Sequence, residues 1–238
     1  MASGKQDLRQ RPRAAVERLI LARDWEGLLL RAGELHGHYC PFLALGVRAG
    51  GEALLELGLD SDGMEDLVAV VETNGCFSDG IQCATGCTFG NNALVFKDVG
   101  KTAVTVVRRG GRGLRLRLRD VENFVAEHSP EAAELFEKVV VRREGSDEDR
   151  EALKKAWTEI SFKVVNLPAE TLFEAERDVG VALPEYAPIY ESRTCARCGE
   201  RVMAPRTVAG PQGDLCLTCA GAPYFQLDGK GMTCVASR

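Results

Sequence analysis

The chain has 238 residues, 45% of them apolar and 27% charged, which is enough for one large domain with or without a small module. Its formal net charge of −5 argues against a dedicated nucleic-acid-binding protein. No apolar run is long enough to span a membrane, and the charged N-terminus lacks the apolar core of a signal peptide, so we expect a cytoplasmic protein. Nine cysteines, four of them in two C-x-x-C pairs, then favour metal and thiol chemistry over disulfides.

The first part of the chain predicts three helices. A short helix over residues 14–23 is followed by a second one, which Asp24 caps and Gly37 ends. Pro41 is a favoured first helical residue and opens a third helix to about Leu57. This helix is apolar on nearly every side, which predicts that it is buried. Its three glycines indicate that another backbone packs closely against it.

Strands and further helices follow. The β-branched run over 67–72 is typical of a central strand. Leucines alternate with arginines from Leu114 to Arg119, which is the period of a strand with one wet face. The other expected elements are strands over 94–97, 102–109, 160–165 and 171–176, helices over 130–143 and 147–158, and one helical turn that Asp79 caps and Gly86 ends.

The motif His36-Gly37-His38-Tyr39-Cys40-Pro41 holds three candidate metal ligands or acid–base groups within five residues. In an extended strand His36, His38 and Cys40 would share one face. Because Pro41 begins a helix, Cys40 lies at or next to the N-cap, where unpaired N–H groups and the helix dipole favour the thiolate. We therefore expect Cys40 to ionise easily and to bind a metal or attack an electrophile. The alternative is a polar turn with incidental histidines.

A second constellation of candidate site residues lies among glycines and comprises Cys76, Asp79, Cys83, Thr85, Cys87, Thr88 and Asn91. Cys83 and Cys87 are four residues apart and would share a face if the chain stayed helical. Nearby glycines allow tight bends close to a site or ligand. The alternative is a loop with structural cysteines, since free cysteine packs well as a small hydrophobe.

The C-terminal segment carries two C-x-x-C pairs separated by seventeen residues: Cys195 with Cys198, and Cys216 with Cys219. Two such pairs are typical of a tetrahedral four-thiolate zinc site. So short a segment cannot build its own core, and we expect the metal to supply its folding energy. A redox dithiol pair and an iron–sulfur site remain alternatives.

The arginines from Arg108 to Arg119 also invite a nucleic-acid interpretation. No aromatic residues interleave them for base stacking, so we favour the wet face of a strand.

Two ordered motifs resemble a known family. His36-Gly37-His38-Tyr39-Cys40-Pro41, followed by Gly46 and Arg48, resembles the opening motif of the formylmethanofuran dehydrogenase E-subunit family. A second block resembles it at Cys76, Asp79, Gln82, Thr85-Gly86-Cys87-Thr88, Gly90-Asn91, Leu94, Asp98 and Gly100-Lys101.

The resemblance covers about residues 25–165, and a zinc ribbon after the core is also an arrangement known in that family. Phe42, Gly80 and Cys83 depart from the family pattern. The resemblance implies an α+β core, dimeric in relatives, with a metal site drawn from the two motifs. It also implies kinship with one component of a tungsten- or molybdenum-dependent complex that reduces carbon dioxide on methanofuran, whose redox centre belongs to other components.

With the predicted elements, we expect an α+β fold with a central, mostly antiparallel sheet and packed helices, followed by a small C-terminal zinc β-ribbon. The expected divisions are a disordered N-terminus over 1–13, the core over 14–180, a linker over 181–191 and the ribbon over 192–238.

We expect two metal positions. Cys195, Cys198, Cys216 and Cys219 would hold a structural zinc. In the core, His36, His38 or both, with Cys40 and one or more of Cys76, Cys83 and Cys87, would hold zinc or another divalent metal. Cys40 and His38 are also the candidate catalytic residues.

Three functional hypotheses follow, in this order. The chain is an accessory subunit serving a molybdenum or tungsten oxidoreductase, a stand-alone zinc or thiol enzyme that uses Cys40, or a nucleic-acid-binding zinc ribbon protein. Because the helix over 41–57 is apolar on nearly every face, we also expect a two-fold homodimer, in which the ribbon could reach a partner's core site.

Overall fold

The computed structural model describes residues 9–58, 60–119, 127 and 129–236. The chain divides into two compact units, the first ending at Leu183 and the second beginning at Pro184. Residues 1–8 of the segment expected to be disordered lie outside the described residues. Arg13, at the end of that segment, donates hydrogen bonds from its guanidinium to the carbonyl oxygens of Cys83 and Ala84.

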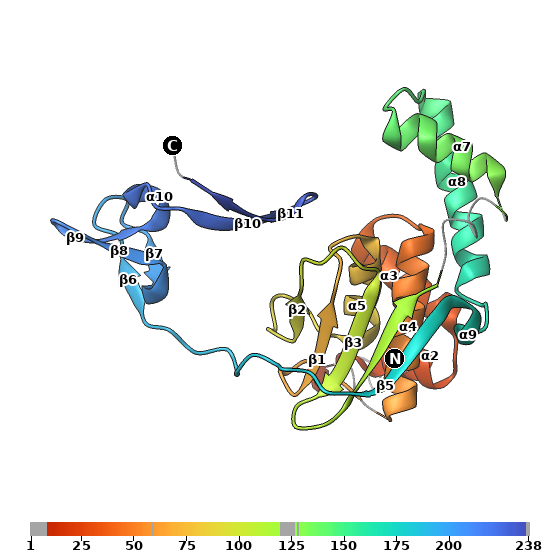
Figure 1. The fold of residues 1–238 in the computed structure, drawn as a ribbon, viewed down its shortest axis with the longest axis horizontal. Coiled ribbons are helices and arrows are strands. Elements are labelled where there is room, and N and C mark those ends of the chain that lie inside the picture. Colours follow the sequence, from red (N-terminus) through yellow and green to blue (C-terminus); the bar gives the residue numbers. More distant parts are fainter. Residues whose placement is uncertain (1–8, 59, 120–126, 128, 237–238) are drawn as a thin grey trace. The chain divides into compact units, whose positions relative to one another are not determined.

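The first unit is built on a five-stranded sheet in the order β2-β1-β3-β4-β5 (Figure 1). Only the β1–β2 pair is parallel among these neighbours, which confirms the predicted mostly antiparallel sheet of an α+β fold. The strands are β1 (Leu67–Val71), β2 (Leu94–Phe96), β3 (Ala103–Arg108), β4 (Gly113–Leu118) and β5 (Phe173–Val179).

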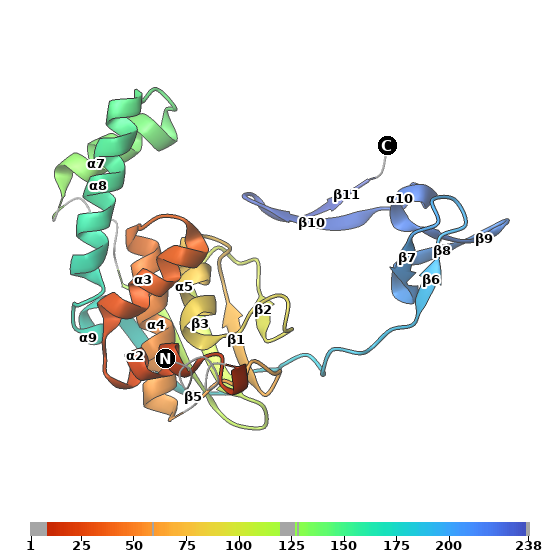
Figure 2. The same cartoon turned by 180° about the vertical axis from the view of Figure 1, so that it is seen from behind.

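Helices α3, α4 and α5 lie together on one face of the sheet, and α7 and α8 form a helical arm that extends beyond it (Figures 1 and 2). A π-helical turn over Glu137–Val141 continues α7. The helices are α2 (Ala14–Leu21), α3 (Trp25–His36), α4 (Pro41–Leu57), α5 (Cys76–Thr85), α7 (Pro130–Phe136), α8 (Asp147–Val164) and α9 (Ala169–Leu172).

The boundaries around the histidine motif form as predicted. The Asp24 carboxylate accepts a hydrogen bond from the backbone N–H of Gly27 at the start of α3. Gly37 ends this helix with φ +87°, a left-handed conformation that favours glycine. Cys40 is the extended N-cap of α4, and Pro41 is its first residue.

The glycines of α4 allow the backbone of α5 to come into contact with it. A Cβ at Gly46 would overlap the carbonyl oxygen of Phe77, and a Cβ at Gly80 would lie 2.5 Å from the Leu43 oxygen. Gly50 contacts Ala84 one turn further along both helices. The two helices are therefore parallel, with their first residues at the same end, and the predicted close backbone contact is confirmed.

The opposite face of the sheet has a smaller apolar cluster. Val68, Val70 and Val107 are fully buried there, packed against Val181 and Leu183. The segment predicted as a linker over 181–191 thus begins with residues that pack on the sheet.

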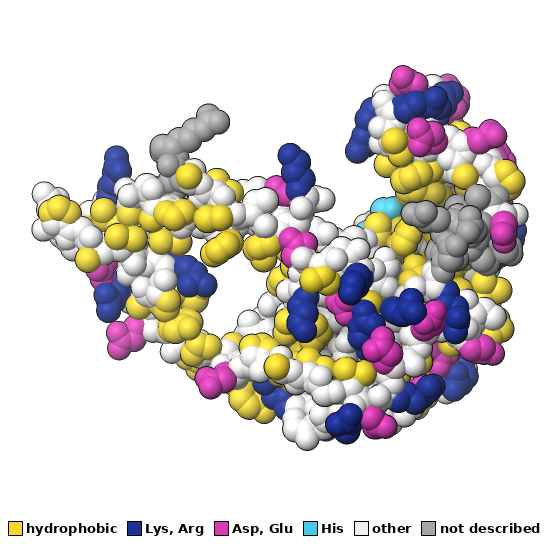
Figure 3. All heavy atoms as spheres, viewed as in Figure 1, with side chains coloured by type: hydrophobic (Ala, Val, Ile, Leu, Met, Phe, Trp, Pro, Cys, Tyr) yellow, Lys and Arg dark blue, Asp and Glu magenta, His cyan; other side chains and the backbone are white. Residues whose placement is uncertain are grey.

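The arginines of β4 pair with carboxylates across the sheet. Arg115 donates to Glu72 at 2.7 Å and to Glu176 at 2.6 Å, and Arg117 pairs with Glu174. Figure 3 shows the basic and acidic side chains interleaved over this face. Since Leu114 and Leu116 are buried between them, the predicted strand with one wet face is confirmed.

Two predicted elements are wrong. Residues 160–165 are not a strand, because α8 continues to Val164 and buries Ile160, Ser161 and Val164 at helical spacing, so packing overrides β-propensity. Asp79 does not cap a single turn, because α5 begins at Cys76 with Gly75 as its N-cap.

The strand expected over 171–176 lies slightly later in the chain. Helix α9 extends to Leu172, and β5 runs over Phe173–Val179.

The second unit consists of three two-stranded antiparallel sheets and one short helix. Of its described residues only Cys195 and Gly231 are buried, so no apolar core holds it together. Its elements are β6 (Ser192–Thr194), β7 (Arg201–Met203), a 3-10 turn (Ala204–Arg206), β8 (Thr207–Gly210), β9 (Gly213–Cys216), α10 (Leu217–Ala220), β10 (Tyr224–Asp228) and β11 (Gly231–Val235).

The close packing of α4 and α5 gives a stability prediction. Gly46→Ala should lower the free energy of unfolding by about 1–3 kcal/mol, because the added methyl group forces the two helices apart. Chemical denaturation measures the change. Gly90→Ala is the control, since nothing lies within 4 Å of a Cβ at that position. Equal stability of the two variants would contradict the close contact.

Candidate metal centres

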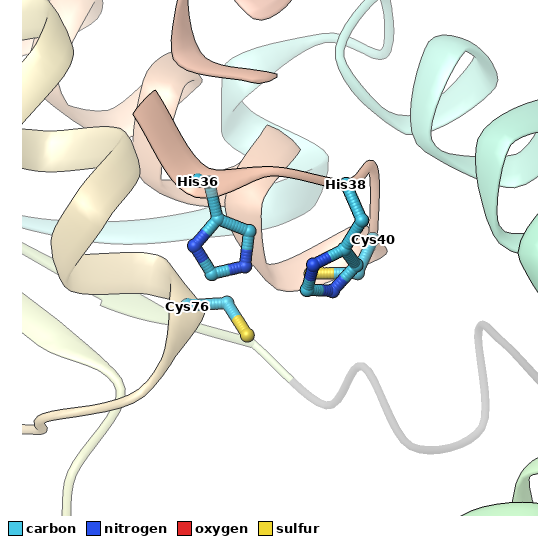
Figure 4. Close-up of side chains that lie close together, drawn as sticks. All are labelled: His36, His38, Cys40 and Cys76. Atoms are coloured by element: carbon cyan, nitrogen blue, oxygen red, sulfur yellow. The ribbon is translucent and has the colours of Figure 1, made fainter. Parts of the chain in front are cut away.

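The core motifs meet at one point of the first unit. His36 is the last residue of α3, His38 lies in the following turn, Cys40 is the N-cap of α4, and Cys76 is the first residue of α5. One ligand atom from each of the four lies within 4.8 Å of all the others. Figure 4 shows the two histidine rings and the two thiols directed toward one another. This group is called the core site below.

The two cysteines lie where two helix dipoles have their positive ends. Because α4 and α5 are parallel, the N-cap thiol of Cys40 and the first-residue thiol of Cys76 lie side by side. Neither helix start has a side-chain hydrogen bond at its N-cap, and the nearby backbone of Leu43 and Phe42 favours the Cys40 thiolate. Both features stabilise sulfur in its anionic form, which is the form that binds metal.

The His36 ring is fixed by a carboxylate. Its Nδ1–H donates to Asp79 Oδ2 at 2.7 Å, and Gln82 Nε2 donates to the other Asp79 oxygen at 3.0 Å. The His36 Nε2 atom is buried and has no hydrogen-bond partner among the described residues. With Nδ1 protonated, Nε2 of the neutral ring offers a lone pair to the core site, as in carboxylate–histidine–metal arrangements.

His38 is held by ring contacts. Its centroid lies 4.4 Å from that of His36 and 5.9 Å from that of Trp157 in α8, with 25° between the latter two planes. Burial lowers the pKa of His38, and repulsion from the neighbouring His36 ring in its protonated form acts in the same direction. Both effects favour the neutral imidazole, which is the metal-binding form.

The two thiols ionise as a pair. The hydrogen bond with Cys40 lowers the pKa of Cys76 to about 6, and His36 contributes in the same direction. The same thiol–thiol interaction, together with burial, raises the pKa of Cys40. Burial thus opposes the expected easy ionisation of Cys40, which is only 3% exposed.

Cys83 and Cys87 do not join the core site. Helix α5 ends at Gly86 in a left-handed conformation, so Cys87 lies beyond the helix and shares no face with Cys83. The Cys87 thiol is fully buried and donates to the carbonyl oxygen of Leu67. Burial raises the pKa of Cys83 to about 11, and both positions behave as small apolar side chains.

The sequence reasoning missed Trp157 as a site residue, and it named Asp79 and Gln82 only as motif positions, without their roles beside His36. Cys76, Asp79 and Gln82 are spaced by three residues along α5, a pattern that could have placed the carboxylate beside the ligand. That signal requires knowing that the helix begins at Cys76. No sequence signal connects Trp157 with His38.

The four cysteines of the second unit also converge. The Sγ atoms of Cys195, Cys198, Cys216 and Cys219 lie within 4.8 Å of one another. Backbone N–H groups point at these sulfurs, from Cys216 to Cys195 and from Cys219 to Cys216, each at 3.3 Å. The N–H groups of Cys198 and Cys216 lower the pKa of Cys195 to about 6.

Comparison with protein families separates the same two units. Residues 35–174 match the family model described as "FmdE, Molybdenum formylmethanofuran dehydrogenase operon", a segment that contains both core motifs. The chain belongs to this FmdE family. Residues 188–224 match the "Prokaryotic dksA/traR C4-type zinc finger". Together with the four-cysteine cluster, this match supports a structural zinc in the second unit.

Two similar proteins extend the comparison. The chain is 48% identical over 210 residues to a "Probable S-adenosyl-L-methionine-binding protein" of Archaeoglobus fulgidus, covering 86% of this chain but only 55% of the relative. The chain thus spans about half the length of that protein. The crystal structure of a protein from Syntrophus aciditrophicus that is similar to the E component (FmdE) of tungsten formylmethanofuran dehydrogenase aligns over 83% of this chain and 92% of its own, at 24% identity and a TM-score of 0.49.

No helix in the described parts of this FmdE-family chain combines the length and apolarity needed to cross a membrane.

The ribbon site gives a metal-removal prediction. Cys216→Ser leaves three thiolates, so the protein should lose one metal equivalent, and amides of residues 192–230 should lose protection from hydrogen exchange. The first unit should keep its melting transition, because it has its own apolar core. Cys234→Ser is the control, since Cys234 lies outside the four-cysteine group. Full metal content in Cys216→Ser would refute the assignment.

Proposed function

We propose that this FmdE-family protein is an accessory metal protein of molybdenum- or tungsten-dependent one-carbon redox metabolism. Its working centre is a metal ion in the core site, and its ribbon zinc is structural. The family description, which names a molybdenum formylmethanofuran dehydrogenase operon, supports the metabolic assignment. The observation that carries the metal site is the buried, unpartnered His36 Nε2 atom facing two thiols and a second imidazole.

The donor set fits zinc or a similar borderline ion. Two thiolates and two imidazoles can give the four-coordinate arrangement that zinc prefers. A bound zinc ion would supply a Lewis acid at this position. The chain's own residues have separate tasks. Asp79 orients the ring of His36, the starts of α4 and α5 stabilise the thiolates, and Trp157 supports His38.

A stand-alone zinc or thiol enzyme is the second candidate. A free nucleophilic Cys40 is disfavoured, because the thiol is buried and its pKa is raised. Cys40 therefore acts as a ligand, and any catalysis would use the metal, with His38 beside it. The nucleic-acid hypothesis ranks last, because the arginines of β4 already pair with carboxylates.

The cellular location and the binding of S-adenosyl-L-methionine are separate questions. All nine cysteines are free thiols, which suits the reducing cytoplasm that we propose as the location. We assign no S-adenosyl-L-methionine binding to this chain, because the relative that bears that name extends far beyond the matched segment.

Metal stoichiometry tests the core site. The wild-type chain should bind two zinc equivalents, and Cys76→Ser should bind one, because the core site would then lack a thiolate. Cys83→Ser should still bind two, since Cys83 lies outside the group. Elemental analysis of purified protein makes the comparison. A wild-type chain with a single equivalent, absent from Cys216→Ser, would refute a core metal.

We also propose a two-fold homodimer. The support for it is the resemblance to a family with dimeric members and the frequency of closed pairs among oligomers, because a single chain already buries α4 on nearly every side. Sedimentation at micromolar concentration should give about twice the chain mass of 25.8 kDa. A mass equal to that of one chain, with or without added zinc, would contradict the dimer.

A further inference from the structure

We propose that the two histidines of the core site have different tasks: His36 is the fixed metal ligand, and His38 is a replaceable ligand whose position a small organic anion takes. The inference rests on the proposed core metal. It explains how a metal ion that already has four protein ligands would bind an additional small molecule, because that molecule would replace His38. The anion would carry one carboxylate or thiolate donor.

His36 is fixed from two sides. His36 is the last residue of α3, so the helix holds its backbone, and its side chain is only 11% exposed. Its Nδ1–H bond to Asp79 is short, at 2.7 Å, and Gln82 in turn holds Asp79. The ligand Cys76 and both of these residues belong to α5, so one rigid helix sets the positions of the thiol and of the His36 ring.

His38 lacks such constraints. It lies in the turn between the left-handed Gly37 and the N-cap Cys40, outside any helix or strand. Its side chain is partly exposed, and neither ring nitrogen makes a hydrogen bond to a described residue. The two contacts that hold the ring are a tilted contact with His36 and a stacked contact with Trp157. Stacking restrains the plane of a ring more than its position within the plane, so His38 can turn away at lower cost than His36.

The surroundings of His38 indicate which molecule would replace it. Trp157 also contacts Phe136, with ring centroids 5.7 Å apart, and Phe136 is 40% exposed at the surface of the arm. An aromatic wall therefore leads from the core site to solvent. The positive ends of α4 and α5 favour a negative donor atom at the metal. A carboxylate or thiolate with an apolar body fits both features.

Metal affinity of single variants tests the asymmetry. With competing chelator, His36→Ala should weaken core zinc by at least about 100-fold, and Asp79→Asn should weaken it by about 10–100-fold. His38→Ala should weaken it by about 10-fold or less, which is the low end of the cost of replacing an outer-shell partner. Asp79→Asn also separates a positioning role from a merely structural one, because its melting temperature should change little. Equal losses in the two histidine variants, or a larger loss in His38→Ala, would overturn the inference.

Imidazole rescue gives a second readout. In cobalt-loaded protein, the visible absorption of His38→Ala should return to that of the wild type when imidazole is added, whereas His36→Ala should not respond. His38→Gln replaces His38→Ala if the alanine variant fails to fold by circular dichroism. An unresponsive His38 variant that retains cobalt would count against the inference.

Probe anions test the ligand class in the wild-type chain. Phenylacetate should shift the cobalt spectrum at lower concentration than acetate, and Trp157→Ala should abolish this preference. Indifference to both carboxylates and to 2-mercaptoethanol would overturn the anion assignment. The two proposals fail differently. A wild-type chain without core metal refutes both, whereas two metal equivalents with equivalent histidines refute this one alone.

Discussion

The contact of α4 with α5 at Gly46 and Gly80 is the constraint on which the core site depends. Only residues without a Cβ permit this backbone separation, and the parallel orientation puts both helix starts at the same end. Cys40 and Cys76 are neighbours for that reason, although 36 positions separate them in the chain. Packing two helix N-termini together is electrostatically unfavourable, and negative charge on the two thiols would relieve it. The packing of α4 against α5 therefore determines both that the two thiols meet and that their anionic forms are favoured there.

The two candidate metal centres differ in what holds their side chains in place. The core site lies beside a large apolar cluster, and its ligands come from helices that pack without a metal, so its geometry is preorganised. The four-cysteine unit buries almost nothing apart from Cys195 among its described residues. We expect the free energy of metal binding at its four sulfurs to supply the free energy of its folding. Metal removal should thus leave the first unit folded and unfold the second.

Features that depend on local chemistry could be predicted from the sequence. Pro41 defined the start of α4, Gly37 the end of α3, and the C-x-x-C spacing the ribbon cluster. Features that depend on tertiary packing could not be predicted in this way. Residues 160–165 have the composition of a strand, yet burial of Ile160 and Val164 keeps them in α8. The same limit applies to the cysteines of α5, because only the position of the helix start decides that Cys76 joins the site and Cys83 does not.

Arg48 connects the core site with the helical arm. This buried side chain of α4 donates to the carbonyl oxygens of Val165 and Leu167, just beyond the end of α8, and pairs with Glu52. A cation at a helix C-terminus is favourable, and Glu52 offsets the burial of its charge. The contact fixes α8 relative to the helix that begins at Cys40. Since α8 carries Trp157, this contact helps to place Trp157 beside His38 of the core site. An arginine eight residues after the site cysteine thus has a structural reason to belong to the opening motif.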